Sequence, residues 1–187
     1  MNLFDMKKKV LGLIEELNPA SELLTEDPDI AAKINGVINQ VMYELVRFKR
    51  IPKYAEIEVK AGDVITFDHI EEAVGYEIFM LGNVCGVKYT PKADGTVLKI
   101  LESGTAEVEC YVYPERITDK TKDKAYEFEI AADLLEIMPY GVAADLLKSD
   151  ASVGYGSVYS SRYESMKNMI DPRYQTDVVT IEGGIDI

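Results

Sequence analysis

The single histidine of the chain, His69, is the first residue to consider for metal or acid–base chemistry. Zinc sites combine several histidine, cysteine or carboxylate ligands at short spacings, and here only Asp68, Glu71 and Glu72 accompany the histidine. An acidic loop between two strands is the commoner explanation of this stretch. The segment KADGT, Lys92 to Thr96, lacks the other carboxylates of a calcium-binding loop and indicates a turn. We therefore expect no bound metal.

Nucleophilic catalysis has little support in the sequence. No serine lies in a GxSxG elbow, and no two carboxylates are marked as a catalytic couple. Cys85 and Cys110 lie in strand-like surroundings, and two cysteines make no disulfide framework in a chain of 187 residues. We expect reduced thiols, no cofactor and no enzymatic activity. A hydrolase that uses Asp68, His69 and Glu71 stays open as an alternative.

The stretch GYGSVYSSRYESM sets three tyrosines four residues apart behind two glycines. A phosphate-binding loop would need further glycines, a Lys-Ser/Thr pair and a preceding strand, which are all missing. On a helix the tyrosines lie one above another, so they share a face. This face packs inside the monomer, or it forms a subunit interface, a role that suits tyrosine. The residues of the hypothetical interface are Tyr155, Tyr159, Arg162, Tyr163 and Met166.

The chain is acidic, with a net charge of −13. A protein that reads a nucleic-acid sequence needs a basic face to neutralise phosphates, so this class is disfavoured. No apolar run approaches the roughly 20 residues that span a bilayer. The N-terminal MNLFDMKKKVLGLIEEL resembles an amphipathic helix more than a signal peptide, because no small-residue cleavage site follows. We expect an intracellular protein that does not bind membranes.

Helical periodicity marks both ends of the sequence. A first helix is expected from Leu3 to Leu17, stopped by Asn18-Pro19. A second begins at Asp27-Pro28, where proline suits the first turn, and it closes at Ile51-Pro52. Its apolar residues recur at i, i+4, i+7 and i+8, which predicts one buried face.

The helical pattern returns after residue 130. One helix is expected from Ala131 to Ile137 and ends at Met138-Pro139. Another runs from Tyr140 to Lys148. The last contains the tyrosine stretch and stops at Asp171-Pro172.

Between these helices the apolar period changes to two. IEVKAGDVITF alternates and breaks at Ala61-Gly62, as a hairpin would. YEIFML, VCGVKY, TVLKI and AEVECYVYP follow as short strands, and after the hydrophilic loop RITDKTKDKA the stretch YEFEI is expected as a last strand. Short strands joined by glycine turns predict a small antiparallel sandwich or barrel.

The predicted fold class is therefore α+β, a helical bundle core interrupted by an antiparallel β-sandwich or barrel-like insertion, with a strand-like C-terminal tail. The helical core takes residues 1–53 and 131–174, the inserted β domain 55–130, and the extended tail 175–187. We expect the tail to add a strand to a neighbour's sheet edge. The residues of that added strand are Val178, Val179 and Ile181.

Four cations lie at the end of the second predicted helix and just beyond it, namely Arg47, Lys49, Arg50 and Lys53. Cations suit a helix C-terminus because they complement the helix dipole. A solvated helix end is the default interpretation. Docking of an acidic partner is the alternative.

Several joined stretches carry a family resemblance. CYVYPERIT, the polar loop, YEFEI, IMPYGVAADLLKSD, GSVYSSRYESM and MIDPRY together resemble head–tail connector, or adaptor, proteins of tailed bacteriophages and prophages. The resemblance spans most of the chain through Tyr174. Members often have an N-terminal and a later helical pair, in some cases with a β domain between them. The large β insertion departs from simpler adaptors, which lack it.

The resemblance implies a non-enzymatic virion protein, made in the bacterial host cytoplasm, that forms a ring beneath the portal. Its partners would be the portal, tail or neck proteins and further copies of itself, and DNA would pass through without sequence-specific binding. A ring requires two different complementary faces on each subunit. The alternative is a virion β-domain protein that binds host glycans or decorates the capsid.

Overall fold

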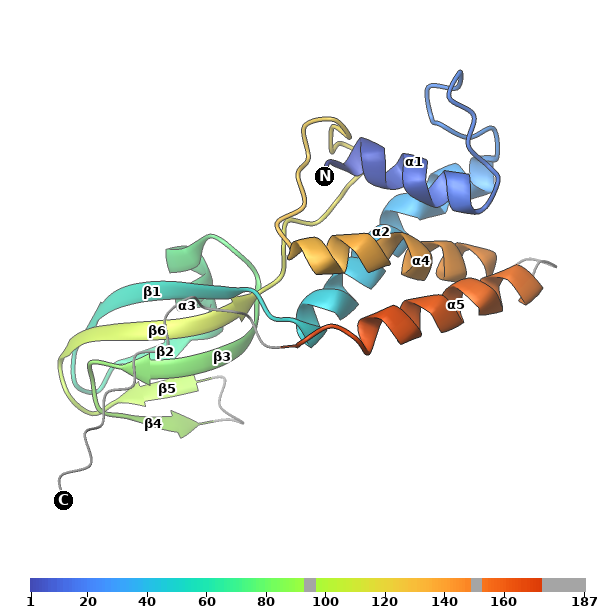
Figure 1. Ribbon diagram of the computed structural model, residues 1–187. Helices are drawn as coiled ribbons and strands as arrows, with labels where there is room; N and C mark the ends of the chain where they lie inside the picture. The colour runs from blue at the N-terminus through green and yellow to red at the C-terminus, as the bar shows by residue number, and fades with distance from the viewer. Residues whose placement is uncertain (93–96, 149–152, 173–187) are drawn as a thin grey trace.

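The structure, a computed structural model, describes residues 1–92, 97–148 and 153–172. Helices gather in one part of the molecule, and strands with one short helix gather in the other (Figure 1). The predicted mixture of α and β structure is confirmed. Within the described residues it comprises five helices and two small antiparallel sheets. No described helix combines the length and apolarity needed to cross a membrane.

The helical part is built around α4, which contacts each of the other three long helices. Side-chain caps begin two of them: Asn2 Oδ1 accepts the Asp5 N–H at 2.9 Å, and Asp27 Oδ1 accepts the Asp29 N–H at 2.8 Å. The four helices of this part are α1 (Leu3–Leu13), α2 (Pro28–Phe48), α4 (Ala132–Leu147) and α5 (Val153–Lys167).

The prediction of two helices on either side of Met138-Pro139 is wrong. α4 runs through Pro139, although an interior proline removes a backbone hydrogen bond and costs a helix about 3 kcal/mol. Pro139 is itself buried, as are Met138 and Val142, and each such side chain gains about 1.5–3 kcal/mol on burial. Packing on both sides of the proline therefore keeps the helix continuous.

The first helix is also shorter than predicted. α1 ends at Leu13, and Glu15 adopts a left-handed φ of 62° that no continuing helix allows. Asn18-Pro19 lies beyond this stop.

Two three-stranded antiparallel sheets form the other part, with strand orders β1-β6-β3 and β2-β5-β4. Neither sheet closes on itself. One cluster of buried residues contains side chains of both sheets and of the short helix α3 (Phe67–Val74). The strands are β1 (Pro52–Val59), β2 (Val64–Thr66), β3 (Ile78–Cys85), β4 (Tyr89–Lys92), β5 (Val97–Ile100) and β6 (Gly104–Val112).

The predicted hairpin around Ala61-Gly62 is wrong, because β1 and β2 belong to different sheets. Gly62 adopts a φ of 99°, and its N–H bonds to the carbonyl of Ile100. The turn thus directs the chain onto β5, with which β2 pairs. The acidic stretch DHIEE is likewise in helix α3, where a loop was expected.

Residues 113–131, between β6 and α4, contain no regular strand, so the strand predicted for YEFEI is wrong. Its only pairing is an isolated bridge between Glu127 and Asn2. Tyr126 and Phe128 are buried among the helices instead, and buried Asn39 of α2 bonds the N–H and C=O of Ile117. This segment was predicted as part of the inserted β domain, but its buried side chains belong to the cluster of the helical part.

Candidate functional site: the α5 face and the junction of the two parts

α5 packs closely on α4 because both helices carry glycine at the contact. A Cβ on Gly156 would meet Leu147 Cβ at 3.4 Å. A Cβ on Gly141 of α4 would lie 2.9 Å from Tyr163 Cε2 and 3.0 Å from Val41 Cγ1. The missing side chain at position 141 is therefore what makes room for the Tyr163 ring.

Two of the three tyrosines point into the monomer. Tyr163 is 6% exposed, and its hydroxyl donates to Glu44 Oε1 of α2 at 3.0 Å. Lys167 pairs with the same carboxylate. The Tyr159 hydroxyl donates to the carbonyl of Leu13, one of the acceptors left without a helical partner at the end of α1. These contacts attach α5 to α2 and α1.

The outer face of α5 is formed by Tyr155, Val158, Arg162, Ser165 and, just past the helix, Met169. Tyr155, Val158 and Met169 are 71%, 61% and 82% exposed. Arg162 and Glu164 are the only exposed charged residues within the helix. Arg162 stacks over the Tyr140 ring, with its Cζ 4.4 Å from the centroid. In a chain of net charge −13, this face is apolar and nearly uncharged.

The residues predicted for the interface thus divide between the two sides of α5. Tyr159, Tyr163 and Met166 contact the helical part of the same chain. Tyr155 and Arg162 lie on the outer face. Beside Tyr155, a hollow of about 210 Å³ opens between the ends of α1 and α4 and the start of α5. The tail residues Val178, Val179 and Ile181 lie outside the described residues.

Alkaline pH should unfold the helical part through its buried tyrosines. Burial, reinforced by Glu44, raises the pKa of Tyr163 above its ordinary value of 10.0, and burial with Glu115 does the same for Tyr126. A tyrosine whose pKa is higher in the folded than in the unfolded state stabilises the folded state in full below pH 10. This stabilisation is lost as the pH rises above 10. Each tyrosine should therefore lower the unfolding free energy by up to about 1.4 kcal/mol per pH unit. Denaturant titrations between pH 8 and pH 11 should give a shallower slope for Tyr163→Phe, and equal slopes would contradict the assignment.

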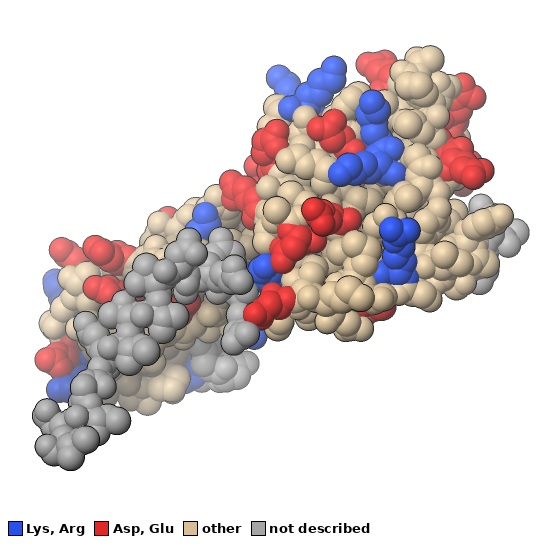
Figure 2. Space-filling view, viewed as in Figure 1, with Lys and Arg blue, Asp and Glu red and all other residues tan. Residues whose placement is uncertain are grey.

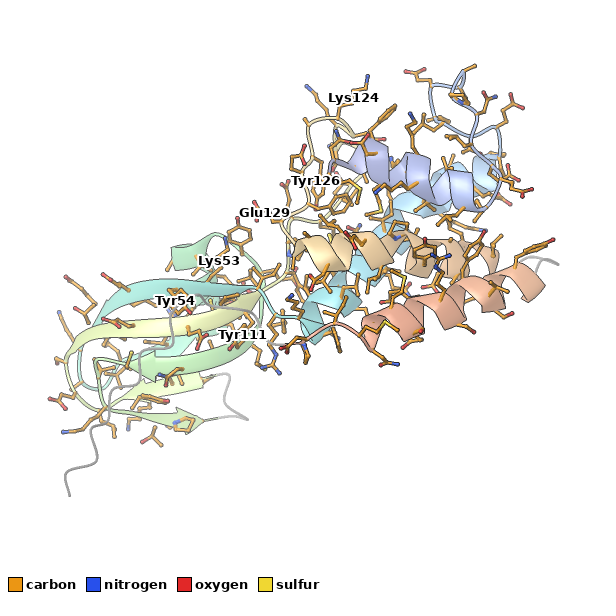
Figure 3. All side chains as sticks on the ribbon, in the orientation of Figure 1. Lys53, Tyr54, Tyr111, Lys124, Tyr126 and Glu129 are labelled. Atoms are coloured by element: carbon orange, nitrogen blue, oxygen red, sulfur yellow. The ribbon has the colours of Figure 1, made fainter. Side chains whose placement is uncertain are left out.

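The four cations predicted to dock a partner lie at the junction of the two parts, and each has a contact within the chain. Arg47 Nε donates to the Tyr113 hydroxyl at 2.6 Å, and Lys49 pairs with Asp133 at 2.6 Å. Arg50 lies over the Tyr111 ring, and Lys53 Nζ lies 4.4 Å from the centroid of the Tyr76 ring. Lys53 and Tyr111 are labelled in Figure 3. This cluster connects α2 to the first sheet and to α4.

Beside these cations the junction has a hollow of about 360 Å³, which the sequence analysis did not foresee. The rings of Tyr43 and Tyr113 stack there with centroids 4.5 Å apart, and the Tyr76 hydroxyl donates to Glu129 at 2.8 Å. The alternating CYVYP stretch is the signal that could have indicated it, because Tyr113, directly after β6, lines the hollow. Burial, together with the nearby Glu77, raises the pKa of Tyr43.

The residues considered for catalysis have structural contacts. His69 Nδ1 bonds the N–H of Thr66, 3.2 Å away, in the capping box of α3, and the Glu71 carboxylate accepts the N–H of Ile78. Cys110 is buried between strands, whereas Cys85 is exposed beside Glu107. Within residues 1–92, 97–148 and 153–172, no three metal-ligating side chains come together.

No protein-family model and no curated protein matches the chain.

Proposed function

We propose that the protein is a non-enzymatic structural subunit of a tailed-phage head–tail connector, which assembles into a ring below the portal. The observation that carries the proposal is the outer face of α5, which exposes apolar side chains and little charge. Exposed apolar patches with aromatic residues are characteristic of protein–protein contacts. The resemblance of the joined stretches from CYVYPERIT to MIDPRY supplies the class of assembly.

The distribution of charge supports contact through this face. Copies with a net charge of −13 repel one another, so a subunit contact is most favourable where few charges are brought together. The inner side of α5 holds the helix in the monomer through Tyr159 and Tyr163, which leaves Tyr155 and Val158 available to a neighbour. In this proposal the helical part is a bundle core and the two sheets are an inserted sandwich.

The other parts of the proposal concern partners. The protein would act in the virion, bound to portal, tail or neck proteins, with DNA passing through the ring without sequence-specific contacts. Acidic side chains along the channel would repel phosphates and let the duplex slide. The Arg47, Lys49, Arg50 and Lys53 cluster would hold the two parts of the subunit in a fixed relation while an acidic partner docks. The tail would add a strand to a neighbouring sheet edge.

Charge placed on the outer face of α5 should abolish ring assembly. The double variant Tyr155→Asp/Val158→Asp puts two carboxylates on the proposed contact and should weaken assembly at least about tenfold, since like charges at an interface cost several kcal/mol. Folding should be unaffected because both side chains are exposed. Particle imaging with the portal is the readout. The matched control is Val64→Asp/Leu101→Asp, at exposed apolar residues of the sheet part, and an equal loss there would contradict the assignment.

The genes beside this one in its source DNA test the class of assembly directly. We expect portal, terminase and capsid genes on one side and tail genes on the other. Metabolic neighbours with no virion genes nearby would refute the connector proposal.

The second candidate is a virion protein whose sheet part binds host glycans or decorates the capsid. It is favoured by one observation, the separate buried cluster of the two sheets and α3. The full-length protein would then bind a glycan array or purified capsids, and Tyr155→Asp/Val158→Asp would bind equally well.

A further inference from the structure

The helical part has a lysine-rich surface. The lysines come from two segments that lie far apart in the sequence. The loop before α4 crosses α1, where the Phe4 N–H donates to the carbonyl of Asp123. Buried Lys7 pairs with the Asp123 carboxylate at 2.8 Å. This contact places the lysines of α1 beside those of the loop. The lysine surface consists of five exposed residues, Lys8, Lys9, Lys120, Lys122 and Lys124.

Two lysines of the lysine surface lie against an aromatic ring, that of Phe4, and not against a carboxylate. Lys124 Nζ and Lys8 Nζ lie 5.1 and 5.7 Å from the centroid of the Phe4 ring. Among the described residues, none of the five lysines forms an ion pair. Figure 2 shows basic side chains over the α1 side of the helical part, and Lys124 is labelled there in Figure 3. The lysine surface therefore keeps a positive charge that an acidic surface could complement.

The other part of the same molecule presents a face with the opposite charge. On the solvent side of the β1-β6 pair, the alternation of the strands aligns Tyr54, Glu56 and Glu58 of β1 with Glu109, Glu107 and Thr105 of β6. No ion pair to any of these four carboxylates is found in the described chain. We call this the acidic sheet face.

The register within this face points to an external cation. Glu56 and Glu107 are direct cross-strand partners, and like charges directly opposite each other destabilise a sheet. Glu109 accepts hydrogen bonds from the Asn83 N–H at 3.2 Å and the Tyr111 hydroxyl at 3.3 Å, and among the described residues no cation pairs with it. A lysine placed between the strands from outside would relieve the repulsion.

We propose that the lysine surface docks on the acidic sheet face of a second copy of this chain, giving a head-to-tail contact between copies. The two surfaces lie on different parts of the subunit, as a heterologous interface requires. Each copy then offers one free surface of each sign, so the contact repeats from copy to copy. The inference deepens the proposed function, because it names the charged contact of the ring, and it is separate from the outer face of α5.

Other polyanions fit the lysine surface less well. A membrane-bound surface needs exposed apolar side chains beside its cations, and among the described residues the exposed large apolar ones lie elsewhere. A nucleic acid would pair with the lysine surface alone and leave the acidic sheet face without a cation, whereas a second copy supplies a partner to both surfaces. Between two copies, charges further apart than about 8 Å are largely screened at physiological salt. The contacting surfaces therefore decide whether two copies attract or repel each other.

Charge reversal tests the contact in the full-length protein. We expect wild type to self-associate in sedimentation experiments at about 0.02 M salt and to dissociate at about 0.5 M, because screening lengths shorten over this range. Lys122→Glu/Lys124→Glu should raise the dissociation constant at least about tenfold, and so should Glu56→Lys/Glu107→Lys. The matched control, Lys33→Glu/Lys92→Glu, makes the same charge change at exposed lysines outside both surfaces and should associate as wild type.

Mixing the two reversed variants is the decisive step. Each fails to associate with itself, but together they restore opposite charges at every contact, so the mixture should associate as wild type does. Failure of the mixture to associate, or a monomeric wild type at low salt, would overturn the inference. Loss of heparin or DNA binding in Lys122→Glu/Lys124→Glu, with wild type still monomeric, would also overturn it and identify another polyanion as the occupant.

Failure of the charged contact can be distinguished from failure of the connector role. Metabolic gene neighbours, or a portal that the protein does not bind, would refute the connector role and leave the rescue by mixing intact. Conversely, rings that form on the portal with either reversed variant alone would retain the connector role and overturn the charged contact.

Discussion

Replacing Tyr163 by alanine is expected to lower the free energy of unfolding by about 3–5 kcal/mol, the usual cost of removing a large buried ring. The ring fills the space above Gly141, which Val41 of α2 also approaches, in the buried cluster of the helical part. The loss would also leave Glu44 with Lys167 as its remaining partner. Chemical denaturation followed by circular dichroism measures the effect.

Tyr155→Ala is the matched control, since it removes the same side chain two turns earlier on the same helix. Tyr155 is exposed, so its loss should change stability by less than about 0.5 kcal/mol. Tyr163→Phe keeps the ring and removes only the hydroxyl bond to Glu44, which should cost about 1 kcal/mol. Equal effects of the two alanine variants would contradict the division of α5 into an inner and an outer side.

Gly141→Ala is expected to destabilise the protein by about 1–3 kcal/mol, the cost of overpacking a core. Helix propensity alone would make the change favourable by about 0.5–1 kcal/mol. The new Cβ, however, would lie 2.9 Å from the Tyr163 ring, which its bond to Glu44 prevents from moving away. The steric term therefore exceeds the propensity term. Thermal and denaturant unfolding measure the difference.

Gly36→Ala is the control, and it should raise the free energy of unfolding where Gly141→Ala lowers it. Gly36 is an exposed interior residue of α2, and nothing lies within 4 Å of the position of an added Cβ. This variant should gain about 0.5–1 kcal/mol. In the Tyr163→Ala background the cost of Gly141→Ala should largely disappear, because the colliding ring is gone. A cost that persists there would mean that Gly141 is required for another reason.

The strongest sequence signals were those that local chemistry alone determines. α2 is predicted by one apolar stripe that begins at Asp27-Pro28. The middle of this stripe is buried in the structure, with further buried residues beside it; the stripe residues that are buried are Ile34, Ile38, Val41 and Leu45. Most strands were found through their alternation, as in β6, where Ala106, Val108 and Cys110 point inward. The turn predicted for KADGT lies largely outside the described residues.

The errors arise where distant residues decide a local conformation. The packing around Pro139 keeps α4 continuous, and the backbone of β5 captures the turn after β1. YEFEI alternates like a strand, but Tyr126 and Phe128 find their buried environment among helices. No local pattern carries this information.

The candidate surfaces were foreseen only in part. The spacing of the tyrosines gives their common face, but whether they point inward depends on glycine at position 141, in another helix. The four cations near the end of α2 are predicted to be solvated or to dock a partner. The tyrosines that meet Arg47 and Arg50 lie more than fifty positions further along the chain, at Tyr113 and Tyr111. The lysine surface and the acidic sheet face depend on which segments the fold brings together.

Imaging the portal protein that we expect to be encoded beside this gene, alone and mixed with the full-length protein, tests the central claim most directly. The account predicts an additional ring of density beneath the portal. The ring should be lost with Tyr155→Asp/Val158→Asp and kept with Val64→Asp/Leu101→Asp. A portal whose images are unchanged by the protein at saturating concentration would contradict the connector role.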